Sequence, residues 1–415
     1  MEVVHERLAG VDISRLDHKV CVRVPGPRGR ARSEVRTFGA MTADLLELVA
    51  WLRAERVTVV AMEATGVYWK PLYYLLEACG DIEPQLVNPH HVKALPGRKT
   101  DVRDCEWLAD VAAHGMVRPS FVPPREIRQL RDLTRLRTEV ARDKVRHVQR
   151  LGAFLEDAGI KLAAVASNVI GVGPRRMLEA MVAGERDPEV LAQMALGAMR
   201  RKIPLLNQAL AGYFTDHHAF VVATLLRGID DADALLEGLE AEIDRHLAPF
   251  RRQVELLCTI PGIQSTLAAV LIAEIGVDMS RFPTAGHLAS WAGVCPGSNQ
   301  SGKKAKRAPT RPGDRWLKGA LGVGATNAIR RKGSYLHAQY WHLARRRGQG
   351  RALVAVSHTM LIAAWHIMTN DTPYQDLGAD HFTTPAGQRR KNRSMINDLT
   401  AQGYTITPPT EPLAV

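Results

Sequence analysis

The run from residue 57 to residue 62, Val-Thr-Val-Val-Ala-Met, constrains the fold of this chain more than any other feature. It is dominated by β-branched residues and carries no charge, which is typical of a strand buried on both faces of a parallel sheet. Parallel strands need a crossover connection, usually a helix, so the run predicts an α/β domain. The residue that follows is Glu63, which places an acidic side chain at the end of a buried strand.

Strand and helix patterns alternate on both sides of this run. Val20, Val22 and Val24 recur with the period of two that marks a strand, and the leucines of residues 45–52 recur at helical spacing. The predicted order is β-β-β-α-β-α-β-α, with strands at residues 8–14, 20–24, 35–38, 57–62 and 85–88, and helices from Thr42, at 71–79 and from about residue 100. This is the order of the ribonuclease H fold.

Four acidic residues occupy related places in this order. In that fold the first and fourth strands are parallel neighbours, so Asp12 and Glu63 are expected side by side, facing the last helix. Asp101 and Asp104 are three residues apart and share one face of that helix. Carboxylates gathered at an inward face need a cation, and hard divalent ions prefer oxygen ligands. We therefore predict a site for one or two Mg²⁺ ions, suited to displacement at a phosphodiester.

Each acid also has a structural interpretation. Asp101 and Asp104 follow Thr100, and acids in a first helical turn complement the helix dipole without any metal. Asp12 can serve as a turn residue and Glu63 as a helix cap. The metal interpretation depends on all four acids falling at the expected elements together.

The overall charge favours a polyanionic partner. Lysine and arginine number 55 against 43 aspartate and glutamate residues, which gives a formal charge of +12. No apolar run approaches the ~18 residues of a membrane span, and the first residues lack the apolar core of a secretory signal. The five cysteines form no close pair, so neither a zinc site nor a disulfide framework is indicated. A cytoplasmic protein without a membrane partner is expected.

A long basic helix is predicted after Pro123 and Pro124, over residues 125–158. Its apolar residues recur every three to five positions, and its basic residues outnumber its acidic ones. A solvated face is the ordinary explanation, but this excess favours a dimerising coiled-coil helix that lies along a nucleic-acid backbone. Residues 175–249 are expected to form further helices that link and space the domains. The predicted nucleic-acid contacts in this helix are Arg128, Arg131, Arg135, Arg142 and Arg146.

Two motifs in the second half indicate phosphate binding. Residues 256–264, Leu-Leu-Cys-Thr-Ile-Pro-Gly-Ile-Gln, precede an apolar helix and resemble a helix-hairpin-helix, although Gln264 stands where that motif ends in glycine and a plain turn between helices is the alternative. Residues 301–351 carry fourteen basic residues against Asp314 alone. Ser301 lies among these cations, either as a nucleophile or as a serine that only holds phosphate. The predicted contacts here are Lys303, Lys304, Lys306, Arg307 and Arg311.

These motifs together resemble the DEDD transposases of one class of insertion sequences, the bridge-RNA-guided recombinases. The likeness rests on Gly-Val-Asp-Ile-Ser around Asp12, Met-Glu-Ala-Thr-Gly-Val-Tyr-Trp around Glu63 and the Lys-Thr-Asp-Val-Arg-Asp segment. Ile-Pro-Gly-Ile, Ala-Gly-Val-Cys-Pro-Gly and the Ser-Gly-Lys loop are similar to that family's C-terminal domain. The resemblance runs from about Val11 to about Ile367.

The resemblance implies a recombinase in which Ser301 attacks DNA and holds a covalent phosphoserine intermediate. Asp12, Glu63, Asp101 and Asp104 would bind Mg²⁺, and the serine and the acids would meet across subunits of a dimer or tetramer. A structured guide RNA would pair with donor and target DNA. Ser298, one short loop away, is the alternative nucleophile. The competing function is a hydrolytic DNA endonuclease or junction resolvase that uses the acids alone, and a non-enzymatic packaging protein is a third.

Four regions are therefore expected. The fold class is an α/β N-terminal ribonuclease H-like (junction-resolvase-like) domain, a long α-helical coiled-coil region and a mainly α C-terminal transposase domain with a helix-hairpin-helix-like element. The predicted bounds are 1–122 for the DEDD catalytic domain, 123–250 for the coiled-coil region, 251–370 for the domain with the serine loop and 371–415 for a C-terminal tail.

Overall fold

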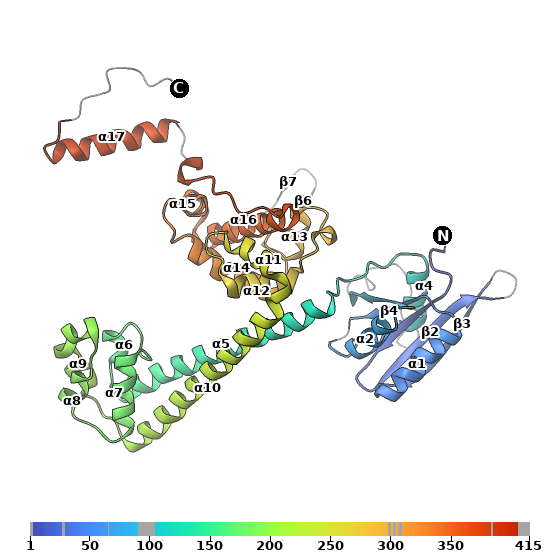
Figure 1. Ribbon diagram of the computed structural model, residues 1–415, viewed down its shortest axis with the longest axis horizontal. Coiled ribbons are helices and arrows are strands. Elements are labelled where there is room, and N and C mark those ends of the chain that lie inside the picture. Colours follow the sequence, from blue (N-terminus) through green and yellow to red (C-terminus); the bar gives the residue numbers. More distant parts are fainter. Residues whose placement is uncertain are drawn as a thin grey trace. The chain divides into compact units, whose positions relative to one another are not determined.

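The computed structural model (Figure 1) describes residues 3–26, 30–64, 66–89, 104–297, 300–301, 304–305, 309–382 and 385–405 of the chain. It divides into two compact units, Met1–Pro123 and Pro124–Val415, and each has its own hydrophobic core. The first unit is an α/β domain and the second is almost entirely helical.

The first unit is built on a five-stranded sheet with the order β3-β2-β1-β4-β5. The first three strands form an antiparallel meander, and β1, β4 and β5 are parallel. This mixed sheet is compatible with the predicted ribonuclease H-like domain. The strands are β1 (Leu8–Ile13), β2 (Asp17–Pro25), β3 (Ala31–Gly39), β4 (Val59–Glu63) and β5 (Glu83–Val87).

Helices cover both faces of this sheet because alternate residues of each strand point to opposite faces and belong to two separate hydrophobic cores. Val11 and Val60 pack with α1 (Thr42–Ala54) and α2 (Lys70–Cys79), whereas Leu8 and Val59 pack with α4 (Asp104–Ala113). A Cβ atom on Gly10 would lie 2.3 Å from the Cys105 carbonyl oxygen. The glycine therefore lets the backbone of α4 lie directly against β1.

Two long helices form the centre of the second unit. α5 (Arg125–Asp157) covers the range predicted for the basic helix and packs along α10 (Asp216–Leu247) in the antiparallel sense, Leu130 with Leu247 at one end and Leu155 with Val222 at the other. Much of the apolar stripe that predicted a dimerising helix is therefore buried within the chain. Short helices close the far end: α6 (Leu162–Val165), α7 (Val172–Val182), α8 (Pro188–Gln193), η2 (Gly197–Lys202) and α9 (Ile203–Leu210).

The rest of the second unit is a helical domain that holds one small β-hairpin. A short turn at Gly262, where φ is 87°, joins α11 to α12 at the place of the predicted helix-hairpin-helix. The elements are η3 (Ala248–Phe250), α11 (Arg251–Cys258), α12 (Ser265–Ile275), η4 (Met279–Arg281), α13 (Ala285–Trp291), β6 (Gln300–Ser301), β7 (Lys304–Ala305), α14 (Arg315–Ala328), α15 (Tyr335–Arg347), α16 (Gln349–Asn370), η5 (Ala379–Phe382) and α17 (Pro385–Ala401).

Among the described residues, α16 is the one helix whose length and composition would suffice to cross a membrane. Its apolar side chains include Val356, Met360 and Leu361, which are fully buried in the core of this domain. The core explains the apolar composition of the helix.

Candidate active site and nucleic-acid interface

Asp12 and Glu63 lie at the carboxyl ends of neighbouring parallel strands. Val11 pairs with Met62 in the register of β1 and β4, so the two acids occupy the next position along the pair. Both side chains are half-buried. The sequence predicted the two acids side by side because it predicted the first and fourth strands as parallel neighbours. The structure has this strand order.

Both acids face α4 rather than α1 and α2. Side chains alternate along a strand, and Leu8 of β1 and Val59 of β4 belong to the core beneath α4. Asp12 and Glu63 are each four residues farther along, on the same face. The carboxyl edge of β1 and β4 therefore carries two carboxylates on the α4 side of the sheet.

The direction of α4 brings its first turn toward this edge. Gly10 lies against Cys105 near the start of the helix. Arg23 pairs with the beginning of β1, and its Nε atom lies 3.2 Å from Oδ1 of Asp110, farther along α4. The helix thus runs from the carboxyl end of β1 toward its amino end.

Asp104 is the first residue of α4 and so lies at the carboxyl edge. Its Oδ1 atom is shielded from solvent. Burial raises the pKa of the neighbouring Cys105 thiol, and the charges of Glu106 and Asp12 act in the same direction. Gly10 packs against Cys105, and Asp12 is two residues farther along on the same face of β1.

The donor set at this edge fits a hard divalent cation because every candidate ligand is a carboxylate. Asp101, the fourth predicted ligand, lies outside the described residues. Within the described ranges, no three His, Cys, Asp or Glu side chains are grouped closely enough to hold a metal ion. Asp12, Glu63 and Asp104 share an edge and a face without making a three-ligand site by themselves.

Lys19 of β2 is a cation that the sequence analysis did not single out. It pairs directly with Asp12 in the antiparallel register of β1 and β2 and is exposed. Directly opposed residues of a pair project to the same face. The short turn after Ile13 folds β2 back along β1. That turn is the sequence feature that could have placed Lys19 beside Asp12.

Ser301 lies on the small hairpin of the second unit, where its backbone pairs with Lys304. The hairpin is closed by a bridge between Pro296 and Thr310 and by a hydrogen bond from Gly297 N to Pro309 O of 2.9 Å. The predicted alternative nucleophile Ser298 and the predicted contacts Lys303, Lys306 and Arg307 lie outside the described residues.

Two family models match this chain. A transposase model of the DEDD, IS110 type matches residues 9–160, and a model described as transposase IS116/IS110/IS902 family matches residues 254–341. The chain belongs to the IS110 family of transposases. It is thus an enzyme of DNA transposition. The first match spans all four predicted acids of this transposase, and the second spans Ser301.

Several relatives resemble most of the length of this transposase. A putative transposase y4pF/y4sB of Sinorhizobium fredii is 25% identical over 79% of the chain and 77% of the relative. The insertion element IS116 44.8 kDa protein of Streptomyces clavuligerus is 25% identical over 79% of the chain and 86% of its own length. The insertion element IS900 42 kDa protein of Mycobacterium paratuberculosis is 26% identical over 88% and 96%.

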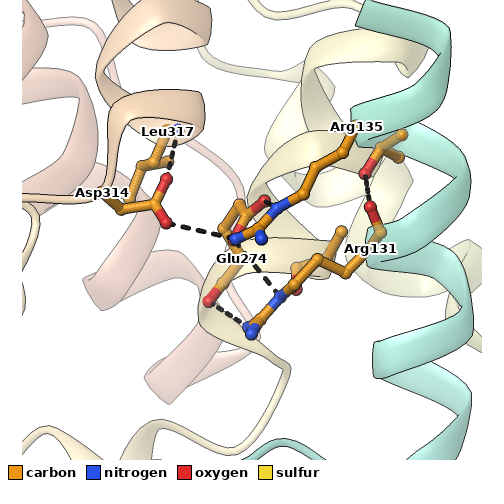
Figure 2. Close-up of polar contacts among 7 residues, drawn as sticks. Arg131, Arg135, Glu274, Asp314 and Leu317 are labelled. Atoms are coloured by element: carbon orange, nitrogen blue, oxygen red, sulfur yellow. Dashed lines mark hydrogen bonds and ion pairs between the residues drawn. The ribbon is translucent and has the colours of Figure 1, made fainter. Parts of the chain in front are cut away.

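A buried ion network joins three segments of the second unit of the transposase. Glu274 of α12 is fully buried, and Arg135 of α5 binds both its carboxylate oxygens, at 2.8 and 2.7 Å. Arg131 donates to the backbone oxygens of Ala273 and Glu274, each at 2.8 Å. Figure 2 shows Arg135 between Glu274 and Asp314, whose carboxylate lies 3.4 Å away and caps the first turn of α14.

This network changes the interpretation of the basic helix. Arg131 and Arg135 were predicted to contact nucleic acid, but Arg131 donates to backbone oxygens of α12 and Arg135 to the carboxylate of Glu274, 139 residues away. Arg142 and Arg146 instead pair with acids one turn away on the exposed surface of α5. Of these arginines, Arg142 and Arg146 therefore lie where phosphate contacts from the surface of α5 are expected.

Proposed function

We propose that this transposase cuts and rejoins DNA through Ser301, assisted by Mg²⁺ held by Asp12, Glu63, Asp101 and Asp104, and that a structured RNA guides it. The observation that supports this most is the placement of Asp12 and Glu63 on the α4 side of the carboxyl edge, next to the first turn of α4. This placement supports a shared role in phosphodiester chemistry over separate roles in capping individual elements.

The four acids would supply an oxygen-only site for the metal. Bound there, Mg²⁺ would stabilise negative charge on the oxygens of the reacting phosphodiester. The acids themselves hold negative charge beside the reacting group, so a carboxylate at this edge can accept the proton that a nucleophilic hydroxyl loses. Lys19, opposite Asp12, limits the excess of negative charge at the edge.

The chemical step conserves the number of phosphate ester bonds. The Ser301 oxygen attacks phosphorus, a serine–phosphorus ester forms, and the bond between phosphorus and one deoxyribose oxygen breaks. The serine proton passes to a base, and the released oxygen is protonated to a hydroxyl. Attack of another strand's hydroxyl on the phosphoserine restores a phosphodiester. The strand is rejoined without an external source of energy, as transposition requires.

The charge of the chain supports a nucleic-acid partner beyond the reacting DNA. Fourteen basic residues lie in residues 301–351 against one acid, and such a surface binds phosphates without reading sequence. Base pairing with a guide RNA would supply the sequence specificity that backbone contacts lack. Sequencing of the RNA that co-purifies with the protein tests this directly, and the recovery of only unrelated cellular RNA would reject guidance.

The nucleophile is tested by trapping the covalent intermediate. Wild-type protein and a substrate duplex should give a protein–DNA adduct in denaturing gels, and Ser301→Ala should abolish both the adduct and strand joining. Ser290→Ala is the matched control because Ser290 is an exposed serine on α13 of the same domain. If Ser301→Ala cleaves at the wild-type rate and Ser298→Ala does not, the nucleophile is Ser298. Cleavage without any adduct in all variants favours the hydrolytic alternative.

The acids are tested with a substitution that keeps size and removes charge. Asp104→Asn should eliminate strand cleavage and leave DNA binding nearly unchanged, because the acid serves the chemical step and the basic surface serves binding. A packaging protein would be unaffected in both properties. The measurement is single-turnover cleavage in parallel with fluorescence anisotropy on the same DNA.

A further inference from the structure

A groove of about 670 Å³ lies on the second unit between α5, the turn that begins α12, and α14. Its walls are largely apolar, and no Asp or Glu occurs among its lining residues, all of which are described. Arg137, Arg142 and Arg146 stand along the α5 side. A groove of this size with apolar walls and a cationic rim suits a flat aromatic group that carries negative charge.

Trp316 of α14 is the aromatic centre of this groove. The indole is half-buried, and the guanidinium carbons of Arg142 and Arg315 lie 5.2 and 4.7 Å from its ring centre. The Arg142 side chain is about half exposed and forms an ion pair with Glu139, one turn away on the same helix. The indole thus lines the groove with surface guanidinium groups against its ring.

The buried ion network fixes this tryptophan. Arg135 binds Glu274 through two hydrogen bonds, reaches Asp314, and lies 5.6 Å from the Trp316 ring centre. Asp314 in turn caps α14 at Leu317. The start of α14 is therefore held against α5 and α12, as Figure 2 shows, and a preorganised ring loses little entropy when a ligand stacks on it.

We propose that this groove binds an unpaired nucleotide of a single-stranded polynucleotide, with its base stacked on Trp316 and its phosphates on the α5 arginines. Aromatic side chains hold unpaired bases by stacking, and every base offers a face for it. The first turn of α12 also opens on the groove through Gln264 and Thr266, where a helix N-terminus favours phosphate. The proposal rests on the proposed function only in taking nucleic acid as the partner.

Charge complementarity favours this occupant over a second copy of the chain. Val145 and Val323 are 54% and 65% exposed at the groove, and an apolar partner helix would cover them. Arg137, Arg142 and Arg146 pair with exposed acids outside the lining (Glu240, Glu139 and Asp143), so an apolar helix in the groove would also desolvate these three ion pairs. A polyanion satisfies both the arginines and the aromatic ring.

The test separates stacking from phosphate binding. Full-length protein is titrated with fluorescein-labelled oligothymidylate, with oligouridylate, and with an abasic oligomer of the same length, about a dozen nucleotides. Trp316→Leu should weaken binding of the base-containing oligomers about tenfold or more and leave abasic binding and the salt dependence unchanged. Trp316→Phe, which retains an aromatic face, should keep most of the affinity. The oligomer with the larger loss identifies RNA or DNA as the source of the base.

A matched control and two outcomes make the test decisive. Trp341→Leu removes another tryptophan of the same domain, 47% exposed on α15, and should change nothing. Equal binding of oligothymidylate by wild-type and Trp316→Leu protein overturns the proposal. The proposal is also overturned if light scattering shows that Trp316→Leu changes the molar mass of the protein while oligomer binding is unaltered. That result would make the groove a protein contact. Because no cleavage is measured, failure here leaves the Ser301 and Asp104 tests independent.

Discussion

A single carboxylate, that of Glu274, shows how a buried charge organises the second unit. Complete burial raises the pKa of Glu274, and the guanidinium groups of Arg135 and Arg131 oppose that shift. Two cations from another helix thus stabilise the charged form of the acid against the cost of its burial. Its value to the fold lies in joining α12 to α5 and, through Arg135, to the first turn of α14.

Glu274→Ala should destabilise the second unit strongly. The substitution leaves two half-buried guanidinium groups without the fully buried carboxylate, and breaking a buried pair in this way lowers the free energy of unfolding by about 3–5 kcal/mol. The measurement is urea denaturation followed by far-UV circular dichroism. Glu240→Ala is the matched control, because Glu240 pairs with Arg137 on the surface and such pairs contribute about 0–1 kcal/mol. Equal effects of the two substitutions would contradict the structural role of Glu274.

At the scale of elements, the contact between β1 and α4 decides where the acids lie. Gly10 is the point of closest approach, since an added Cβ would lie 2.3 Å from the Cys105 oxygen and 2.5 Å from the Ala109 nitrogen. Both atoms belong to the backbone, so neither can move without moving the helix. The position of the first turn of α4 against β1 depends on this glycine.

Gly10→Ala should therefore displace α4 and reduce strand cleavage. Overpacking of this kind destabilises a domain by about 1–3 kcal/mol, and the loss should appear in the thermal transition of the first unit. Gly152→Ala in α5 is the control, because nothing lies within 4 Å of its added Cβ and alanine favours a helix by about 0.5–1 kcal/mol. Unchanged cleavage by Gly10→Ala would show that the placement of α4 is not needed for the reaction.

The elements also show which patterns a sequence conveys. The buried run ending at Glu63 predicted β4 because both faces of that strand are apolar. β3 was predicted at residues 35–38 and extends over Ala31–Gly39, since it is an edge strand whose mostly exposed residues carry no alternation. The stripe on α5 predicted a dimer, but periodicity states that a face is buried and not against what. Within the chain α10 covers part of this face, including Leu130 and Leu155, whereas Leu136 and Val145 are exposed, so the dimer stays a prediction.

At the scale of the molecule, the acidic edge was predictable and the basic surface was only partly so. Asp12 and Glu63 follow from strand order, which the short-range patterns determine. Arg131 and Arg135 could not be separated from Arg142 by sequence, because all lie on one helix with the same local charges. Only the fold brings Glu274 to the first two. The groove at Trp316 likewise requires three segments that are distant in the sequence.

The separate cores of the two units allow a prediction about metal binding by the whole chain. Each unit has its own hydrophobic core, so calorimetry should resolve a transition for each. Mg²⁺ binds the native first unit in our proposal and should raise only its transition, by about 1.4 kcal/mol at tenfold excess over the dissociation constant. Asp104→Asn should remove this shift, whereas Asp110→Asn, a change at an exposed acid on the same helix, should retain it. NaCl at equal ionic strength controls for screening. If the Asp104→Asn protein shows the same Mg²⁺ shift as the wild type, the metal does not bind at the acidic edge.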